Sequence, residues 1–332
     1  MKTNTILQFD TVKFVSDSKN LLSYTDELFM RDVDTTTGEV KSALYSSRRS
    51  NHIPFELRIY VNYRSRELKI EFSSKILLGN YPHLICYYNF MECLQNINRL
   101  GICKLDENAI MKDCQFSKLH ITKDIDMKLT DDKLNALNRL VGNYRRYKWT
   151  RYNNTGITFV SDVQSIYDRE EIILYDKETE ILLNKNNAFL SMTGKRNEIK
   201  EYFEGKTRVE MRLEGKKKIR NELKILDTSW NSLKMVEDNP LLRQFNKVFT
   251  AETVVEYPAM NNINDLLMYN YVKSYNGDLK RIEQSIKDSI SYKSRGTLGK
   301  QMKKMAEIAK RLKMGEPKDN NVLAEIRGLL SY

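Results

Sequence analysis

Cysteine, histidine, proline and glycine are all scarce in this chain of 332 residues. The four cysteines (Cys86, Cys93, Cys103 and Cys114) form no Cys-x-x-Cys pair, and only three histidines are present. A structural zinc site is therefore not expected, and we interpret the cysteines as reduced thiols of a cytosolic protein. Because there are only five prolines and thirteen glycines, long regular elements should dominate the fold.

Long apolar runs are also missing. No stretch approaches the roughly 18 apolar residues of a membrane-spanning helix, and residues 1–6 lack the basic and apolar regions of a secretion signal. We therefore expect no membrane association. Hydrophobic residues still make up 41% of the chain and charged residues 30%, which is enough apolar material for folded domains. Lysine and arginine number 55 against 44 acidic residues, a net charge of +11 that favours a polyanionic partner.

Alternating apolar and polar residues predict strands in the first 230 residues. Residues 55–63 and 67–72 alternate with period two and predict a hairpin that turns near residues 63–66. Further strands are expected at 116–127, 156–161, 171–177 and 207–213. Two amphipathic helices interrupt them, one at 87–100, which Gly101 ends, and one that starts at Thr130. This order predicts an α+β fold with a mixed or antiparallel sheet and helices on one face.

Beyond about residue 235 the pattern becomes helical. Leu279, Ile282, Ile286 and Ile290 form one apolar stripe, and Met302, Met305, Ile308 and Leu312 form another. Residues 277–314 contain eleven Lys or Arg and four Asp or Glu, a net of 11 − 4 = +7. We therefore predict an N-terminal α+β domain over 1–232 and a basic helical domain over 233–332.

The strand around His120 is the first candidate for chemistry. Side chains at alternate positions share a face, so His120, Thr122 and Asp124 can converge on one point. Imidazole and carboxylate together suit Mg²⁺ or Mn²⁺. The alternative interpretation is a polar strand surface facing solvent.

A tyrosine next to a lysine is the second candidate. Tyr175 and Lys177 share a face if residues 171–177 form a strand, and a nearby cation or metal favours the phenolate of a tyrosine nucleophile. An ordinary surface Tyr–Lys pair is the alternative. The segment 167–170, Tyr-Asp-Arg-Glu, resembles 175–178, Tyr-Asp-Lys-Glu, so Tyr167 is a second candidate nucleophile.

Two further segments carry cations in a regular pattern. Arg208, Glu210 and Arg212 should line one face of a strand, where they can hold a phosphate and a metal or simply form a surface ion-pair ladder. Residues 144–152 interleave cations with aromatic rings, as in surfaces that contact phosphates and stack unpaired bases, although half-buried strand residues would look the same. The DNA-contact candidates are Arg145, Arg146, Tyr147, Lys148, Trp149, Arg151, Arg208 and Arg212.

The order of these pieces resembles the filamentous-phage gene II replication proteins. Residues 70–80 look like their strand that is followed by Lys, two aliphatic residues and Gly. Residues 117–122 look like their Ser-Arg-Ile-Asp strand, and residues 173–177 look like the Ala-Tyr-Leu-Lys segment that carries the nicking tyrosine. Residues 208–213 look like their Arg-Phe-Glu-Ala-Arg-Ile strand. The likeness spans about 55–225, and its Tyr-Asp-Lys and Arg-x-Glu motifs are also similar to plasmid rolling-circle initiators of the Rep_trans type.

This resemblance implies a metal-dependent, site-specific DNA-nicking and strand-transfer enzyme that starts rolling-circle replication in a bacterial cytoplasm. It implies Tyr175 as the nucleophile, Lys177 as its partner, Mg²⁺ or Mn²⁺ as cofactor, and an origin in single-stranded or supercoiled DNA as substrate. Host helicase and polymerase are the implied partners. The wider superfamily has two histidines around one hydrophobic residue, whereas this chain has His120-Ile121-Thr122. The candidate metal ligands are therefore His120 together with Glu71, Asp124 and Glu210, which compete for the remaining positions.

Two other functions fit the same residues. A non-enzymatic, sequence-specific DNA-binding protein, such as an origin or partition factor, would use the basic surface without tyrosine chemistry. A relaxase or transposase would share the chemistry in a different biological context.

Overall fold

The computed structural model describes residues 6–142, 146–152, 154–163, 165, 169–249, 262–275, 277–289, 295–314 and 317–331. The chain divides into two compact units, the first formed by 1–128 and 163–241 and the second by 129–162 and 242–332. This division differs from the predicted boundary at residue 232, because residues 129–162 belong with the C-terminal helices. Local periodicity reveals an element but not its packing partner, so the insertion could not be seen in the sequence.

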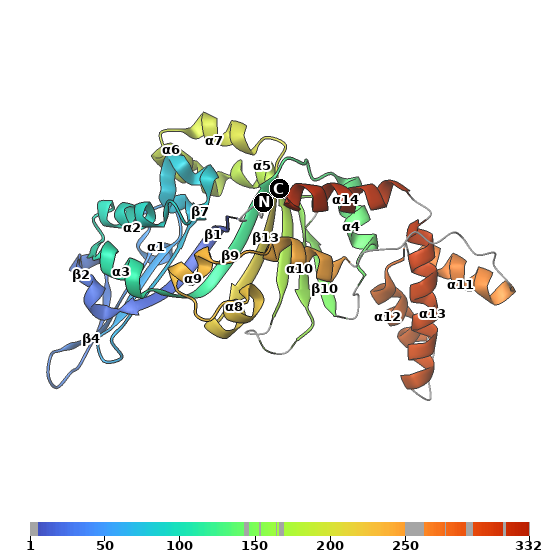
Figure 1. Cartoon of the computed structure of the whole chain (residues 1–332), viewed down its shortest axis with the longest axis horizontal. Helices are drawn as coiled ribbons and strands as arrows, with labels where there is room; N and C mark the ends of the chain where they lie inside the picture. Colours follow the sequence, from blue (N-terminus) through green and yellow to red (C-terminus); the bar gives the residue numbers. More distant parts are fainter. Residues whose placement is uncertain are drawn as a thin grey trace. The chain divides into compact units, whose positions relative to one another are not determined.

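The first unit is an α+β structure built on a large antiparallel sheet (Figure 1). Its strands are β1 (Gln8–Asp17), β2 (Leu21–Tyr24), β3 (Met30–Val33), β4 (Val40–Ser46), β5 (Leu57–Asn62), β6 (Glu67–Ser73), β7 (Ile85–Cys86), β8 (Cys103–Leu105), β9 (Gln115–Ile125), β12 (Glu171–Asp176) and β13 (Thr207–Glu214). Its α-helices are α1 (Ser47–Ser50), α2 (Phe90–Arg99), α3 (Glu107–Asp113), α5 (Lys177–Ile181), α6 (Asn187–Met192), α7 (Arg196–Phe203), α8 (Lys216–Leu223) and α9 (Trp230–Lys234). Short 3₁₀ segments are η1 (Ser18–Asn20), η2 (Asp26–Leu28), η3 (Ser74–His83) and η4 (Asn184–Asn186).

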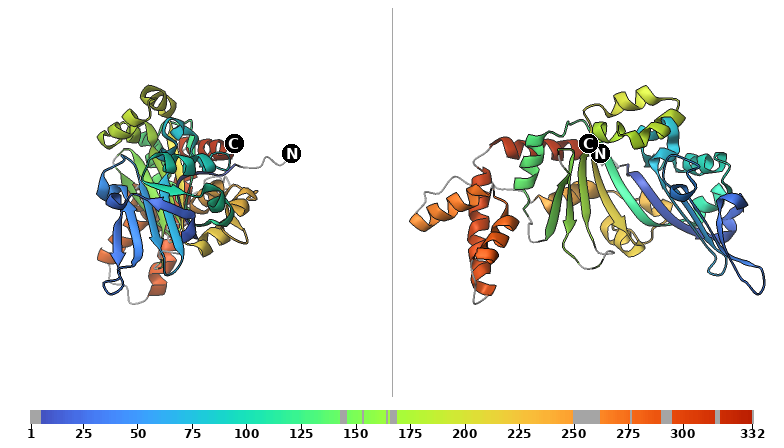
Figure 2. Two further views of the ribbon diagram at one scale, coloured as in Figure 1. Left: turned by 90° about the vertical axis from the view of Figure 1, so that its left-hand side faces the viewer. Right: turned by 180° about the vertical axis from the view of Figure 1, so that it is seen from behind.

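The strands of this unit follow the order β12-β13-β9-β1-β6-β5-β4-β3, and β7 pairs with the start of β1. Every neighbouring pair in this path is antiparallel. A separate pair, β2 and β8, forms a small second sheet. The hairpin β3–β4 extends beyond the helices of the unit (Figure 2). The predicted sheet is thus antiparallel, and its β5–β6 hairpin turns where the sequence pattern indicated.

One face of the sheet is apolar and covered by helices. Phe14 of β1 contacts Phe90 of α2 with ring centroids 5.7 Å apart, and Phe90 stacks on Trp230 of α9 at 4.3 Å. Phe72 and Phe116, from β6 and β9, pack against the same Phe90 ring. Because these rings are fully or almost fully buried, the hydrophobic contribution to folding is concentrated on this face.

The opposite face carries polar and charged side chains, because β-strand residues alternate between faces. We call it the polar face, defined by Thr11, Lys13, Arg58, Tyr60, Lys69, Glu71, Lys118, His120, Thr122, Asp124, Glu171, Tyr175, Arg208, Glu210 and Arg212. At one end of the strands it is covered by η3 and the α5–α7 segment (Figure 1). The predicted arrangement of helices on one face therefore holds for α2, α8 and α9, whereas α5–α7 belong to the other side.

Several local predictions are confirmed. Helix α2 ends just before Gly101, whose φ of +70° suits glycine. Strand β9 occupies the predicted 116–127 segment, and β13 the predicted 207–213 segment. One correction is needed at the end of β12: Lys177 begins α5 instead of ending the strand, because the Asp176 side chain accepts a hydrogen bond from the Thr179 N–H and caps the helix.

The second unit consists of α4 (Asp131–Arg139), β10 (Tyr147–Tyr152), β11 (Gly156–Ser161), α10 (Pro240–Val248), which begins at the end of the first unit, α11 (Ile263–Ser274), α12 (Leu279–Ser289), α13 (Arg295–Met314) and α14 (Pro317–Ser331). Thr130 caps α4 as predicted, and β10 and β11 form an antiparallel hairpin. The two predicted stripes meet in one apolar cluster that includes Ile282, Ile286, Met302 and Met305. Ile290 and the Leu312 side chain lie outside the described residues. The C-terminal region is thus mostly helical (Figure 2).

Within the described part of the chain, no helix combines the length and apolar character needed to cross a bilayer.

Candidate functional site

Three adjacent strands bring the predicted site residues onto the polar face in three cross-strand rows. Strand register places Tyr175 opposite Arg208 and Arg208 opposite Asp124. The next row is Ile173, Glu210 and Thr122, and the third is Glu171, Arg212 and His120. Tyr175 and His120 thus lie two strands and four residues apart, on the order of 17 Å between Cα atoms.

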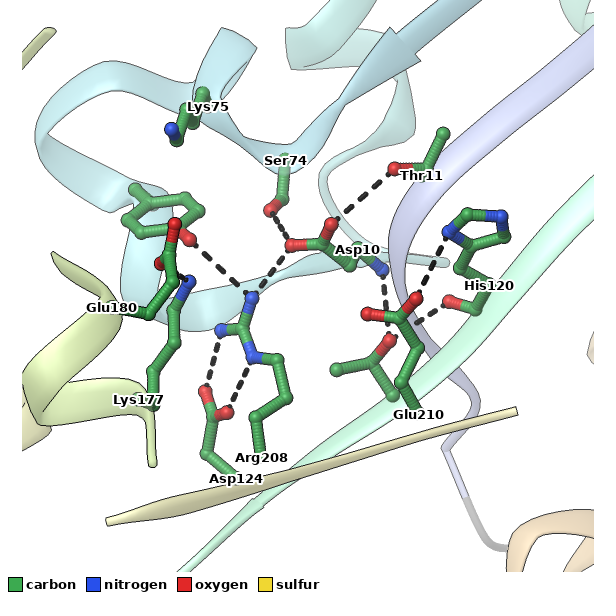
Figure 3. Close-up of polar contacts among 12 residues, drawn as sticks. Asp10, Thr11, Ser74, Lys75, His120, Asp124, Lys177, Glu180, Arg208 and Glu210 are labelled. Atoms are coloured by element: carbon green, nitrogen blue, oxygen red, sulfur yellow. Dashed lines mark hydrogen bonds and ion pairs between the residues drawn. The ribbon is translucent and has the colours of Figure 1, made fainter. Parts of the chain in front are cut away.

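Arg208 is the centre of a buried ion network at the α5–α7 end of this face (Figure 3). Its Nε and Nη2 donate to the two carboxylate oxygens of Asp124 at 2.6 and 2.8 Å. Its Nη1 donates to Asp10 Oδ1 at 2.6 Å and to the hydroxyl of Tyr81 at 3.3 Å. The Ser74 hydroxyl donates to Asp10 as well, at 3.0 Å. The guanidinium is completely buried, so it ties β1, η3, β9 and β13 together.

This network corrects two sequence predictions. Arg208 was predicted to contact DNA, but a guanidinium with no exposed surface and two carboxylate partners is a structural ion pair. Asp124 was predicted to compete for a metal, but both of its oxygens accept from Arg208. Alternation in the sequence showed that both side chains share a face, and it could not show that they face each other.

A histidine–carboxylate pair lies at the other side of the rows. His120 Nδ1 is 3.2 Å from Oε1 of Glu210, and Arg212 Nε donates to the same oxygen at 2.7 Å (Figure 3 shows the His120–Glu210 contact). Among the residues that the structure describes, His120 Nε2 has no hydrogen-bond partner although it is buried. A neutral imidazole whose Nδ1–H is held by a carboxylate presents a lone pair at Nε2. His120 is therefore oriented to accept a proton or bind a cation.

Burial acts to raise the pKa of Glu210, but the hydrogen bonds from His120 and Arg212 and the positive charge of Arg212 outweigh it and lower the pKa to about 2. Glu180 behaves in the same way: burial opposes ionisation, yet Lys177 and neighbouring lysines lower its pKa to about 2. Both carboxylates are therefore ionised throughout the neutral range.

These lowered pKa values predict acid sensitivity. An unfolded glutamate has a pKa near 4.5, so below that value the unfolded state binds the proton first and stability falls as pH drops from about 5 towards 2. We expect urea denaturation of Glu210→Gln to show a smaller loss of stability over this range than wild type. The exposed Glu27→Gln variant is the control, and an equal loss in both variants would contradict the assignment.

Tyr175 is half-buried at the end of β12, and its hydroxyl makes no hydrogen bond to any described residue. Burial raises the pKa of Tyr175 well above 10, while the nearby cations Lys177 and Arg208 act in the opposite direction. The neighbouring cations thus favour the phenolate of Tyr175, as predicted, but burial favours the neutral phenol more strongly. The phenol is neutral in this structure and would lose its proton only during a reaction.

Lys177 is buried in the aromatic surroundings of Tyr175, Tyr81 and Phe203. Its Nζ lies 5.7, 5.3 and 5.5 Å from the centroids of these rings, and it donates to Glu180 Oε2 at 2.6 Å. Burial and Arg208 act to lower the pKa of Lys177, but the two tyrosines and Glu180 raise it overall. Lys177 is therefore a fixed cation beside the Tyr175 ring.

The four predicted metal ligands do not form one cage. Glu71 lies on β6, where it pairs with Lys118 at 2.7 Å. Asp124 is held by Arg208, and only His120 and Glu210 are in contact. Within the described residues, no group of three or more His, Cys, Asp or Glu side chains is placed to hold a metal ion. The donor that fits a metal is the unpartnered His120 Nε2, and further ligands would have to come from substrate or water.

The cation–aromatic segment lies on β10 of the second unit. Tyr147 is buried, and its hydroxyl accepts from Gln244 at 3.2 Å. Trp149 packs against the helical cluster and donates to Asn138 at 2.6 Å, with Lys280 Nζ 4.8 Å from its ring. The half-buried-strand interpretation is therefore correct for these two aromatics.

The cations of β10 differ in exposure. Arg151 pairs with Asp131, and Lys148 pairs with Asp162. Lys148 and Arg146 are both exposed, and the Arg146 guanidinium lies 5.8 Å from the centroid of the Tyr147 ring. Arg145 and Tyr167 lie outside the described residues. Arg212 is partly exposed and pairs with Glu210 and Glu171.

The sequence interpretation missed four members of the polar network: Asp10, Tyr81, Lys75 and Glu180. Lys75 donates to Asn186 at 2.7 Å, and burial lowers its pKa. Asp10 could have been found, because residues 8–17 alternate like the other strands. Tyr81 and Lys75 belong to η3, whose irregular backbone gives no periodic signal.

A scan against protein-family models gave no match, and a search of curated proteins gave none either.

Proposed function

We propose that this protein nicks DNA at a specific site and transfers the cut strand through a phosphotyrosine, with Tyr175 as the nucleophile. The observation that carries the proposal is the common placement of its parts. Tyr175, with a free hydroxyl beside Lys177, shares one sheet face with an oriented histidine, His120, whose Nε2 is unpartnered. The first unit would then be a Rep-like nicking domain that initiates rolling-circle replication of a phage or plasmid.

The reaction we propose is an in-line displacement. Tyr175 Oη attacks the scissile phosphorus and loses its proton, the bond from phosphorus to the 3′ oxygen breaks, and that oxygen takes up a proton. The products are a 5′-phosphotyrosyl enzyme and a free 3′-hydroxyl. Lys177 stabilises the developing phenolate or phosphate charge. Because the phosphodiester is exchanged and not hydrolysed, a later attack by a 3′-hydroxyl rejoins the strand without ATP.

Mg²⁺ or Mn²⁺ is the cofactor of this proposal, with His120 Nε2 as its ligand and Glu210 holding the ring from Nδ1. When bound, such an ion polarises the scissile phosphodiester as a Lewis acid. The scissile phosphate would lie above the middle row, between Tyr175 and His120. The substrate would be origin DNA, single-stranded or supercoiled, in a bacterial cytoplasm, where a host polymerase extends the 3′-hydroxyl and the host replication helicase is a further partner.

A nicking assay tests the function. Supercoiled plasmid carrying the protein's own gene region is incubated with the protein and Mg²⁺ or Mn²⁺, followed by denaturation and gel analysis. The proposal expects open-circle DNA with protein attached to a 5′ end. Relaxed DNA without attached protein, or no relaxation with either metal, would count against it.

Replacement of His120 should separate binding from cleavage. In His120→Ala, DNA affinity should stay within about twofold of wild type, since Lys and Arg contacts dominate it. Nicking should fall at least 10- to 100-fold, as when metal-site partners are lost. Exposed His52→Ala is the matched control. Near-normal nicking by His120→Ala would show that His120 is not needed for the reaction.

The second candidate is a non-enzymatic DNA-binding protein, such as an origin or partition factor. The raised pKa of Tyr175 and the cation pairing of Glu71, Asp124 and Glu210 favour it. It expects sequence-specific DNA binding with no covalent adduct under any metal condition. A relaxase or transposase would form the adduct, but on a different DNA site.

A further inference from the structure

A second group of charged residues crosses the polar face away from Tyr175. Register aligns Lys118 of β9 with Lys13 of β1, Lys13 with Glu71 of β6, and Glu71 with Arg58 of β5. The same row reaches Ser46 of β4. Five strands at about 4.8 Å spacing make this row about 19 Å long. It begins two residues from His120 on β9, so it continues the polar face from the candidate site.

Helix α1 turns this row into a groove. A cavity of about 330 Å³ is bounded by Arg48 and Arg49 of α1 and by Arg58, Glu71 and Lys118 of the sheet, together with Ser46, Ser47, Glu56, Leu44 and Leu57. Four cations and two carboxylates give it a net charge of 4 − 2 = +2.

The two carboxylates are already neutralised inside the groove. Glu56 accepts from Arg48 at 2.8 Å, and Glu71 accepts from Lys118 at 2.7 Å. Among the described residues, the one hydrogen bond of the Arg49 guanidinium is to the sulfur of Met30, at 3.4 Å. Arg58 is exposed and forms no ion pair within 4.0 Å in the described structure. The excess charge therefore resides on Arg49 and Arg58, whose guanidinium groups suit phosphate oxygens.

An aromatic ring stands next to these arginines. Tyr60 is two residues from Arg58 on β5 and points to the same face. Its hydroxyl accepts from Asn62 at 3.3 Å, and Lys69 Nζ lies 5.8 Å from the ring centroid. A half-buried, anchored ring beside a row of cations is the combination that binds unpaired bases and their phosphates.

We propose that this groove binds the backbone of single-stranded DNA on its way to or from the Tyr175 site, with Tyr60 as a stacking platform. The length of the row favours an extended polyanion over a single phosphate, and the aromatic ring favours an unpaired strand over a duplex. The identification of the polyanion as DNA rests on the proposed function, whereas the phosphate-binding geometry does not.

Salt dependence of binding tests the groove. The probe is a fluorescent 20-nucleotide oligonucleotide, bound to the full chain at several salt concentrations. The triple variant Arg48→Gln, Arg49→Gln and Arg58→Gln should lower the slope of log K against log salt by up to about 2, since each phosphate contact on a single strand contributes about 0.7. The control removes the same charge elsewhere: Lys19→Gln, Lys104→Gln and Lys112→Gln. Equal slopes for the two triple variants would overturn the proposal.

The stacking role has its own test. Tyr60→Leu should weaken single-stranded binding at least fivefold and leave duplex binding unchanged. Tyr88→Leu, which removes an exposed ring elsewhere, should change neither the single-strand affinity nor the duplex affinity. Equal weakening of duplex and single strand would overturn the single-strand assignment. These measurements need no cleavage. If the triple arginine variant has a reduced salt slope but the protein forms no covalent adduct, the groove binds single strands and the nicking proposal is wrong. If an adduct forms but the slope is unchanged, the nicking proposal stands and the groove proposal is wrong.

Discussion

Tyr175→Phe should bind origin DNA with wild-type affinity and form no covalent adduct, a loss of at least about 10³-fold in nicking rate, as for other nucleophile deletions. The physical reason is that the change removes one oxygen and leaves the ring in its place beside Lys177. Since the Tyr175 hydroxyl makes no hydrogen bond to a described residue, its loss should not destabilise the fold. Far-UV circular dichroism and urea midpoints should therefore match wild type.

Tyr167→Phe is the matched control, because Tyr167 opens the near-identical segment Tyr-Asp-Arg-Glu. It should retain most of the activity. Peptide mapping of the trapped adduct decides between the two tyrosines. An oligonucleotide attached to Tyr167, or to neither residue, would reject Tyr175 as the nucleophile.

Asp124→Ala should destabilise the first unit by about 3–5 kcal/mol. It leaves the buried guanidinium of Arg208 without the partner that accepts its Nε and Nη2 hydrogen bonds. Asp10 still binds Nη1, but it cannot replace two charge-assisted hydrogen bonds. Urea denaturation at pH 7 measures the change.

An exposed ion pair provides the comparison. Asp26→Ala removes the contact of Asp26 with Arg31, whose side chains are 59% and 42% exposed, and should cost at most about 1 kcal/mol. Similar losses for Asp124→Ala and Asp26→Ala would mean that Arg208 is hydrated in solution and that the network does not hold the strands together.

The secondary structure was predictable wherever the residues of a single strand or helix show a periodic pattern of apolar and polar side chains. The alternation of β5, β6, β9 and β13 and the stripe of α2 follow from residues close in the chain. The faces were predictable for the same reason. Pairing between strands was not, because alternation does not reveal register. The His120–Glu210 contact and the Arg208–Asp124 ion pair both depend on the β9–β13 register.

The sequence predicted which residues belong to the site better than it predicted which of them contact each other. Sequence reasoning selected His120, Glu210 and Tyr175, all of which lie on the polar face. It also assigned Arg208 to DNA, because a charged residue in an alternating strand is usually exposed. The buried exception arises from Asp10 and Tyr81, which approach Arg208 from distant parts of the chain.

The Asp10–Arg208 ion pair joins residues 198 positions apart, so it sets an order of events during synthesis. Strand β1 leaves the ribosome early, but its Asp10 has no guanidinium to meet until β13 has followed. Until then the sheet lacks the strand that carries Glu210, and His120 has no carboxylate to orient it. A nascent or truncated chain that ends before β13 therefore cannot hold the assembled site. The nicking activity we propose would therefore require a chain that extends at least through β13.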